Sequence, residues 1–177
     1  AFSQNKAVVN LTNETTIDGE QILLGNIAQI SADEEKNKRL REISLGFSPN
    51  IGMKREIFRD TILLNIIAAG FSTNEFTLQS SPKIIVYRSS QILNQDLMRE
   101  AVEKAVLANF KADKIETKII KLQLPEKILL PKGNIEVIAA PMSGIRNFLA
   151  PFTVLLEIKV DGKTRQRASA NVEIETF

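Results

Sequence analysis

Two stretches near the end of the chain alternate apolar and polar residues so regularly that they fit an antiparallel strand pair with one buried face. The apolar positions are all even-numbered: Phe152, Val154, Leu156 and Ile158 on the first stretch, and Ala168, Ala170, Val172 and Ile174 on the second. Pairing even with even requires a connecting loop of odd length. We therefore predict a three-residue loop over 160–162, with Gly162 left-handed and Glu157 opposite Arg165. A two-residue turn would instead direct Arg165 and Arg167 onto the apolar face.

The rest of the second half is predicted to be one helix followed by further strands. Asn94 is a suitable N-cap for a helix that ends at Phe110, because its side chain accepts a hydrogen bond from an unpaired backbone N–H. Helical spacing predicts an apolar face made of Leu97, Ala101, Val102, Ala105 and Val106. Strands are expected over 115–124, 128–130 and 134–140, before the final pair.

The first half is predicted to combine short strands with two helices. The strands are expected at 7–11, 15–19 with its turn, 21–24, 43–47, 76–79 and 83–87. Asn26 is expected to cap a short turn that runs to Ile30, and Ser31 with Glu34 forms a capping box for a surface helix. A second helix over 58–69 is predicted to end before Gly70. Its predicted buried residues are Phe58, Ile62, Leu63, Ile66 and Ile67.

These elements indicate an α+β fold in two parts. A small mixed α/β N-terminal domain is expected over 1–89, and a helix plus antiparallel β-sheet domain over 90–177. Residues 89–91 form the junction, which is either a hinge or a fixed turn. With 177 residues, of which 44% are hydrophobic, the chain is long and apolar enough to bury cores in both parts.

The absence of Cys, His and Trp from the sequence narrows the possible functions. Without Cys and His, thiol nucleophiles and the commonest general base and metal ligands are missing. No Gly-rich phosphate loop occurs either. Glu173 and Glu175 share one strand face, yet nothing near them in the sequence indicates a paired-acid site. We therefore expect no enzyme, with no catalytic residues, no cofactor and no metal.

Charge and hydropathy exclude two further classes of partner. The chain has 23 basic and 21 acidic residues without a basic stripe, so nucleic-acid binding is not expected. No apolar run approaches the ~20 residues that cross a bilayer, so membrane insertion is not expected. The chain opens with Ala1-Phe2-Ser3, which fits either cleavage of a signal peptide after a small residue or a trimmed chain.

A loop bounded by Pro141 and Pro151 is unusually apolar for a connection between two strands. Apolar loop residues often mark a surface for a protein partner. On that interpretation the partner-binding residues are Ile145, Arg146, Phe148 and Leu149. The alternative, which we favour, is that the three apolar residues among them fold back and cover the end of the sheet.

Three strings occur in a fixed order: Ile22-Leu23-Leu24-Gly25-Asn26-Ile27-Ala28, the stretch with Pro49, Gly52 and Arg55, and Lys83-Ile84-Ile85-Val86-Tyr87-Arg88. In this order they resemble the family of flagellar P-ring assembly chaperones. The resemblance continues through the long helix and the closing strand pair around Asp161-Gly162. Each string is short, and it is their order and spacing that make the match specific.

The resemblance implies an exported, non-catalytic protein of the periplasm of Gram-negative bacteria. Members of that family bind P-ring protein subunits and help them polymerise around the flagellar rod. Their α+β architecture continues into a C-terminal β-clip module of the SAF type, whereas this chain stops at Phe177 without it. If client binding requires that module, residues 1–177 would fold without functioning alone.

Other readings remain open at this point. A periplasmic glycan- or peptidoglycan-binding or pilus-assembly module is the first alternative, although only one Tyr, Tyr87, and no Trp is available for stacking on a sugar. A carboxylate hydrolase would need two acids that converge in a cleft. A chaperone should instead expose a sheet edge or an apolar groove, expected beside 134–140 and 152–160. An exposed edge or groove of this kind would also allow two copies of the chain to associate.

Overall fold

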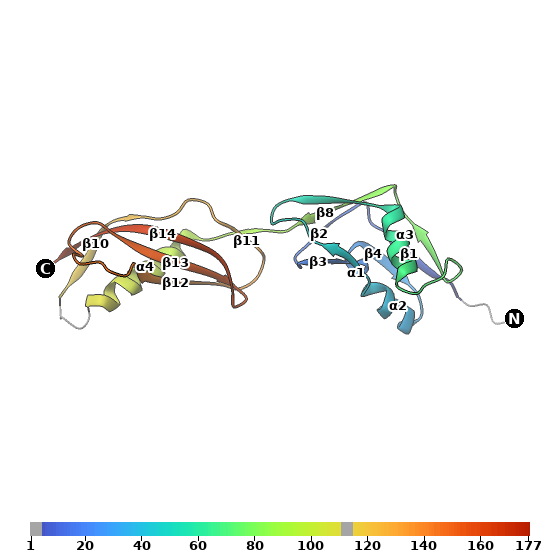
Figure 1. The fold of residues 1–177 in the computed structure, drawn as a ribbon, viewed down its shortest axis with the longest axis horizontal. Helices are drawn as coiled ribbons and strands as arrows, with labels where there is room; N and C mark the ends of the chain where they lie inside the picture. The colour runs from blue at the N-terminus through green and yellow to red at the C-terminus, as the bar shows by residue number, and fades with distance from the viewer. Residues whose placement is uncertain (1–4, 111–114) are drawn as a thin grey trace. The chain divides into compact units, whose positions relative to one another are not determined.

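The computed structural model describes residues 5–110 and 115–177, and it has the predicted α+β class. The chain divides into two compact units, one up to Ser90 and one from Gln91 (Figure 1). Each unit has its own hydrophobic core. Ala1-Phe2-Ser3, interpreted as the result of signal-peptide cleavage or of trimming, lies outside the described residues. The expected division into domains 1–89 and 90–177 stays a prediction.

The first unit is built from three small sheets and three helices. Its strands are β1 (Ala7–Leu11), β2 (Glu14–Ile17), β3 (Gln21–Leu23), β4 (Ala28–Ser31), β5 (Ser44–Phe47), β6 (Lys54–Phe58), β7 (Phe76–Gln79) and β8 (Lys83–Arg88). Its helices are α1 (Leu24–Ile27), α2 (Glu34–Arg41) and α3 (Arg59–Ala68). The strand orders are β4-β1-β7, β2-β8-β6 and β3-β5. Apolar residues from every sheet meet in one core, in which Val9, Ile22 and Ile84 are fully buried.

Two strands of this unit were not predicted, and two caps were assigned to the wrong residue. Asn26 is the third residue of α1, where its Oδ1 accepts a hydrogen bond from the Leu23 N–H at 2.9 Å. The expected turn through Ile30 is strand β4, which pairs antiparallel with β1. The residues just before the second predicted helix form β6, the antiparallel partner of β8. Ser31 belongs to β4, and Asp33 caps α2 by accepting a hydrogen bond from the Lys36 backbone N–H at 2.9 Å. Strand β4 therefore includes Ser31, the residue that the predicted capping box required as N-cap.

Helix α3 ends as predicted but buries fewer residues. The Gly70 N–H donates to the Ile67 carbonyl (3.0 Å) and the Phe71 N–H to the Ile66 carbonyl (3.4 Å), which is the Schellman arrangement, and Gly70 has φ +99°. Ile62 and Ile66 are fully buried, whereas Phe58 and Ile67 are 58% and 40% exposed. The core therefore covers a narrower stripe of α3 than the apolar spacing in the sequence indicates.

The residues that carried the family resemblance have structural roles in this unit. A Cβ on Gly25 would lie 3.0 Å from the Cβ of Arg41, so glycine allows α1 and α2 to approach closely. Gly52 has φ +74°, and its N–H donates to the Arg88 carbonyl at 3.3 Å. Arg55 Nη1 donates to the Phe47 carbonyl at 2.7 Å. These residues fix turns and packing.

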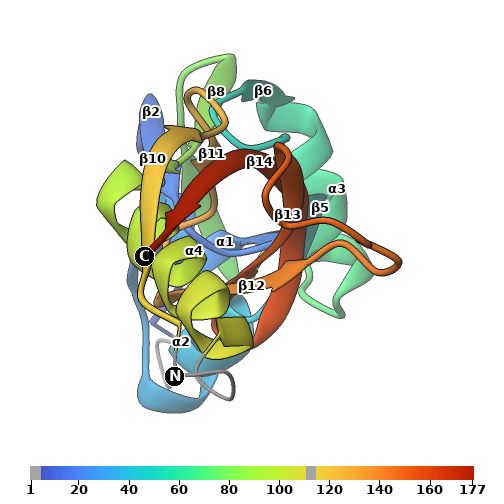
Figure 2. The ribbon, with the colours of Figure 1, turned by 90° about the vertical axis from the view of Figure 1, so that its left-hand side faces the viewer.

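The second unit is a curved antiparallel sheet folded over one long helix (Figure 2). Its elements are β9 (Gln91–Ile92), α4 (Gln95–Phe110), β10 (Thr117–Gln123), β11 (Leu129–Leu130), β12 (Ile135–Pro141), β13 (Phe152–Val160) and β14 (Lys163–Thr176). The sheet order is β10-β14-β13-β12, and β9 pairs separately with β11. All the even-numbered apolar residues predicted on β13 are buried, and so are Ala170, Val172 and Ile174 on β14.

Helix α4 begins as predicted but turns a different stripe toward the core. Asn94 Oδ1 accepts a hydrogen bond from the Asp96 N–H at 2.8 Å, which confirms the cap. The residues of α4 that are buried are Met98, Val102 and Val106. Leu97 is 40% exposed, and the predicted alanines of the same face are only half-buried. The apolar face of α4 is therefore wider than the surface that the sheet covers.

The hairpin of β13 and β14 corrects the predicted loop. Asp161 and Gly162 both have positive φ (49° and 79°) and form the two-residue turn that we had excluded. The pairing then shifts by one residue between Ile158 and Lys159, so that β14 carries one extra residue, Arg165. This bulge restores even-with-even pairing, and Glu157 lies opposite Arg167 instead of Arg165. A bulge can correct the face of a strand, so turn length alone did not decide the register.

Candidate partner-binding surface

The four-stranded sheet of the second unit has two edges, β10 and β12, and they differ in how far they are protected. On β10 the register shifts between Ile119 and Lys121, and Lys118 adds a second basic side chain. Bulges and lysines are common means of preventing a strand edge from pairing. Over Ile135–Pro141, β12 has neither a bulge nor a basic residue, and only its terminal Pro141 lacks an N–H. The second expected edge, 152–160, was wrong, because β13 is paired on both sides.

The hydrogen bonds at the two ends of β12 show which of its backbone groups point to the open edge. The Met142 N–H donates to the Thr153 carbonyl, and the Asp161 N–H donates to the Asn134 carbonyl, each at 2.9 Å. In an antiparallel pair, residues that exchange hydrogen bonds alternate with residues that do not. The even-numbered residues of β12 therefore bond to β13. The N–H and C=O groups of Ile135, Val137 and Ala139 point away from β13, where no strand of the described chain pairs with them.

The inner face beside this edge is only partly covered. The inward-facing residues of the neighbouring strand β13 are buried, whereas Ile135, Val137 and Ala139 on β12 are half-buried. Helix α4 lies against β12. Its side that carries Glu103 and Leu107 lines a hollow with β10, so helical geometry places the opposite side nearer β12.

That opposite side of α4 is apolar. It carries Leu97, Ala101, Ala105 and Ala108, of which Leu97 and Ala108 are exposed and the other two are half-buried. The part of the predicted helix face that the sheet does not cover thus adjoins the open edge of β12. We call Leu97, Ala101, Ala105 and Ala108 the α4 flank.

The outer face of the sheet carries an apolar patch next to the same edge. Ile138 and Leu155 are 40% and 49% exposed, and Ala140 lies directly opposite Leu155 in the register. A shallow hollow of about 240 Å³ is lined by these three residues together with Leu156, Glu157, Arg167 and Ala168. Its charged rim is paired, because Glu157 lies opposite Arg167. A hydrogen bond from the Thr164 hydroxyl (2.5 Å) is the main cause that lowers the pKa of Glu157.

The structure separates the four partner-binding residues predicted in the loop between β12 and β13. Ile145 and Phe148 pack against the core of the second unit, and the Phe148 ring meets Phe110 and Phe152 edge to face, at centroid distances of 5.6 and 5.1 Å. Arg146 is exposed, and Leu149 is 68% exposed. The loop therefore covers the end of the sheet through two side chains. A role of Arg146 and Leu149 in partner binding stays a prediction.

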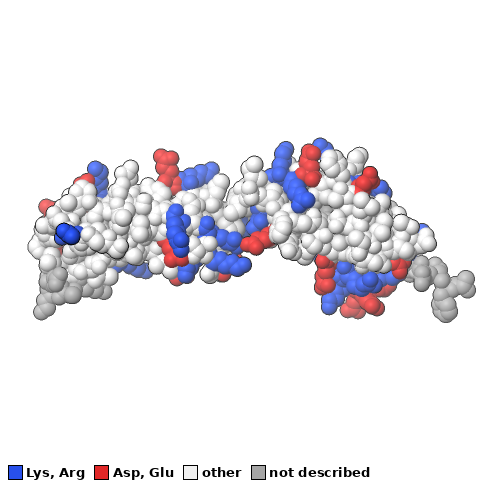
Figure 3. All heavy atoms as spheres, viewed as in Figure 1, with Lys and Arg blue, Asp and Glu red and all other residues white. Residues whose placement is uncertain are grey.

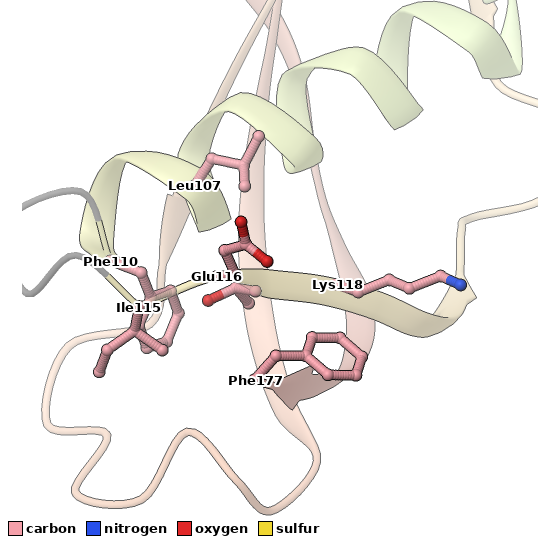
Figure 4. Close-up of a pocket in the computed structure, with 7 residues that line it drawn as sticks. Leu107, Phe110, Ile115, Glu116, Lys118 and Phe177 are labelled. Atoms are coloured by element: carbon pink, nitrogen blue, oxygen red, sulfur yellow. The ribbon is translucent and has the colours of Figure 1, made fainter.

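A second hollow lies at the end of α4, between β10 and Phe177, the residue that follows β14 (Figure 4). It has a volume of about 380 Å³, and its apolar lining includes Leu107, Phe110, Ile115 and Phe177. The Phe177 N–H donates to the Glu116 carbonyl at 2.9 Å, which extends the β10–β14 pairing. Residues 111–114, which follow Phe110 in the sequence, lie outside the described part of the chain. The polar residues that line the hollow within the described part are Glu116, Thr117 and Lys118.

Acidic and basic side chains do not form a reactive cluster in the described residues. They are interspersed on the face shown in Figure 3. Glu173 contacts Lys121 at 3.4 Å, and Glu175 lies opposite Lys118 in the register. Within 5–110 and 115–177, no group of three or more His, Cys, Asp or Glu residues is placed to hold a metal ion. No helix in those ranges is both long enough and apolar enough to cross a membrane.

Comparisons with known proteins return distant similarities only. The chain matches no family model and no curated protein. A functionally unknown protein from Eubacterium ventriosum is 14% identical over 47% of this chain and 95% of its own, with a TM-score of 0.38. The flagellar protein FlgA from Thermotoga maritima is 13% identical over 96% of this chain, with a TM-score of 0.30. This chain spans 53% of the length of that protein, and neither likeness carries an argument about function.

Proposed function

We propose that this protein is a periplasmic assembly chaperone that binds subunits of the flagellar P-ring and holds them for polymerisation around the rod. The observation that carries the proposal is the open edge of β12, with an apolar patch on its outer face and the apolar α4 flank on its inner face. The ordered strings that resemble the P-ring chaperone family support the same role. The role needs no catalytic group and no cofactor.

The physical argument concerns a subunit before it polymerises. Such a subunit exposes strand edges or apolar surface that the finished ring will bury, and exposed edges pair readily with other chains. Adding a strand to an open sheet edge supplies backbone hydrogen bonds, while neighbouring side-chain positions supply selectivity. Pairing along the seven residues of β12 supports reversible binding, which a chaperone needs in order to release its client.

The test is capture of purified P-ring subunit by the chain 1–177, with two variants that differ only in the edge they alter. Ile138 on β12 and Ile120 on β10 are both exposed isoleucines, at 40% and 56%. We expect Ile138→Ser to reduce capture and Ile120→Ser to leave it at the wild-type level. Absence of capture by the unaltered chain would refute the proposal that residues 1–177 hold the client, and binding to peptidoglycan fragments in its place would favour a glycan-binding module.

A further inference from the structure

We propose that β12 accepts one extended segment of its partner in antiparallel orientation, and that this segment carries apolar residues at its inward positions and a Lys or Arg beside Glu136. The inference rests on the proposed function, because it specifies what the chaperone recognises in its client.

The backbone sets the length and the direction. Three residues, Ile135, Val137 and Ala139, direct both an N–H and a C=O to the open edge, and Pro141 ends this series because it has no N–H. In an antiparallel pair each such residue exchanges two hydrogen bonds with one partner residue. Every neighbouring pair in this sheet is already antiparallel. A partner segment of about seven residues therefore spans the edge.

The side chains of the added segment would alternate between the two faces of the sheet. The partner residues opposite Ile135, Val137 and Ala139 point inward, where the α4 flank leaves Leu97 exposed. The partner residue opposite Ile138 points outward and adjoins Leu155. Apolar side chains at these four positions remove apolar surface from water on both faces, and polar ones there would lose hydration without gaining partners.

Charge selects the residue opposite Glu136. Glu136 is exposed on the outer face and is the charged residue of β12 itself. Lys159 lies directly opposite it on β13, and the other side of Glu136 faces the position of the added strand. Residues directly opposite across two strands stabilise the pair when their charges differ and destabilise it when they are alike. A basic residue therefore fits this position, and an acidic one does not.

The same position argues against a second copy of this chain as the occupant. If two copies pair through β12 about a two-fold axis, edge-facing odd residues must meet odd residues. Glu136 then lies opposite Glu136, Ile138, Ala140 or Asn134 of the copy. None of these is basic, so self-pairing adds no complementary charge on the edge side of Glu136, beyond Lys159 on its own β13. A partner of different sequence satisfies the edge better.

The probe for the test is a synthetic peptide, Ser-Thr-Val-Ile-Val-Lys-Val, whose lysine falls opposite Glu136 when its first residue lies opposite Pro141. We would titrate it into ¹⁵N-labelled 1–177 and follow the amide signals and their hydrogen exchange. We expect protection of the Ile135, Val137 and Ala139 amides. Replacing the lysine of the peptide with glutamate should weaken binding by up to about fivefold, which corresponds to the upper end of cross-strand pair energies.

Two protein variants supply matched controls. Ala139→Pro removes one edge donor without removing a hydrogen bond to β13, whereas Ala139→Gly keeps that donor and removes only the Cβ methyl group. We expect the first to lose peptide binding and the second to keep it. Since the proline variant could fold poorly, Glu136→Lys is the independent test, and it should prefer the glutamate peptide to the lysine peptide.

The outcomes separate this inference from the proposed function. Equal binding of both peptides by the unaltered chain, or protection of β10 amides instead, would overturn the inference. So would concentration-dependent dimerisation that protects the same three β12 amides. If P-ring subunit is captured equally by the unaltered chain and by folded Ala139→Pro, the inference fails while the function stands. Peptide selectivity without capture of the subunit would support the inferred edge chemistry and refute the P-ring client.

Discussion

Phe148 provides a direct test of whether the loop between β12 and β13 covers the core or serves a partner. Phe148 is half-buried and meets two other rings edge to face. A buried Phe→Ala change costs about 3–5 kcal/mol, and each aromatic pair contributes ~0.5–1.5 kcal/mol. Because Phe148 is only half-buried, we expect Phe148→Ala to lower the free energy of unfolding by about 2–3 kcal/mol.

The assay is differential scanning calorimetry of the chain 1–177. For a domain of the size of the second unit, a loss of 1 kcal/mol lowers the Tm by roughly 4–8 °C, so Phe148→Ala should lower its transition by about 10–20 °C. Leu149→Ala is the matched control, because Leu149 is 68% exposed and its loss should change stability by less than about 0.5 kcal/mol. If both variants melt within ~2 °C of the unaltered chain, the covering role of Phe148 is refuted.

Two further predictions concern a glycine and an ion pair. Gly133→Ala should destabilise the second unit by about 2 kcal/mol or more in urea unfolding, because φ is +140° and the new Cβ would lie 2.4 Å from Asp161 Oδ2. The control is Gly144→Ala, which should cost about 1 kcal/mol, because φ is +83° there but the space around it is open. A hydrogen bond from Lys83 (2.8 Å), and then its charge, lower the pKa of Glu56, so this pair stabilises the fold above the ordinary glutamate pKa near 4.5 and the contribution is lost as pH falls below it. An NMR titration of Lys83→Gln should show the Glu56 pKa raised toward 4.5, and an unchanged pKa would contradict this assignment.

Local sequence signals predicted the elements whose geometry depends on near neighbours. The Asn94 cap and the Gly70 helix end are examples, because each depends on hydrogen bonds within a few residues. Strand β4 was missed because its partner, β1, lies far from it in the sequence. The cap at Asp33 was misplaced for the same reason, since β4 extends through Ser31.

The candidate surface could be predicted only in part. The stretch 134–140 was expected to be an edge, and β12 is one, but 152–160 was expected as well and is internal. The residue pattern of a strand does not indicate whether it pairs with one neighbouring strand or with two. Leu97, Ala101 and Ala105 of the α4 flank were likewise predicted as core, because an apolar side chain has the same spacing whether or not a strand covers it.

The sequence by itself determined which residues of the final hairpin face inward, because a strand alternates its side chains with a period of two and burial of one face is strongly favourable. Tertiary structure decided how that pattern was satisfied, through a two-residue turn and a bulge at Arg165. It also decided that β12 lies at the edge and that part of α4 remains uncovered beside it. These features depend on which segments meet in space, and that is set by the packing of the whole unit.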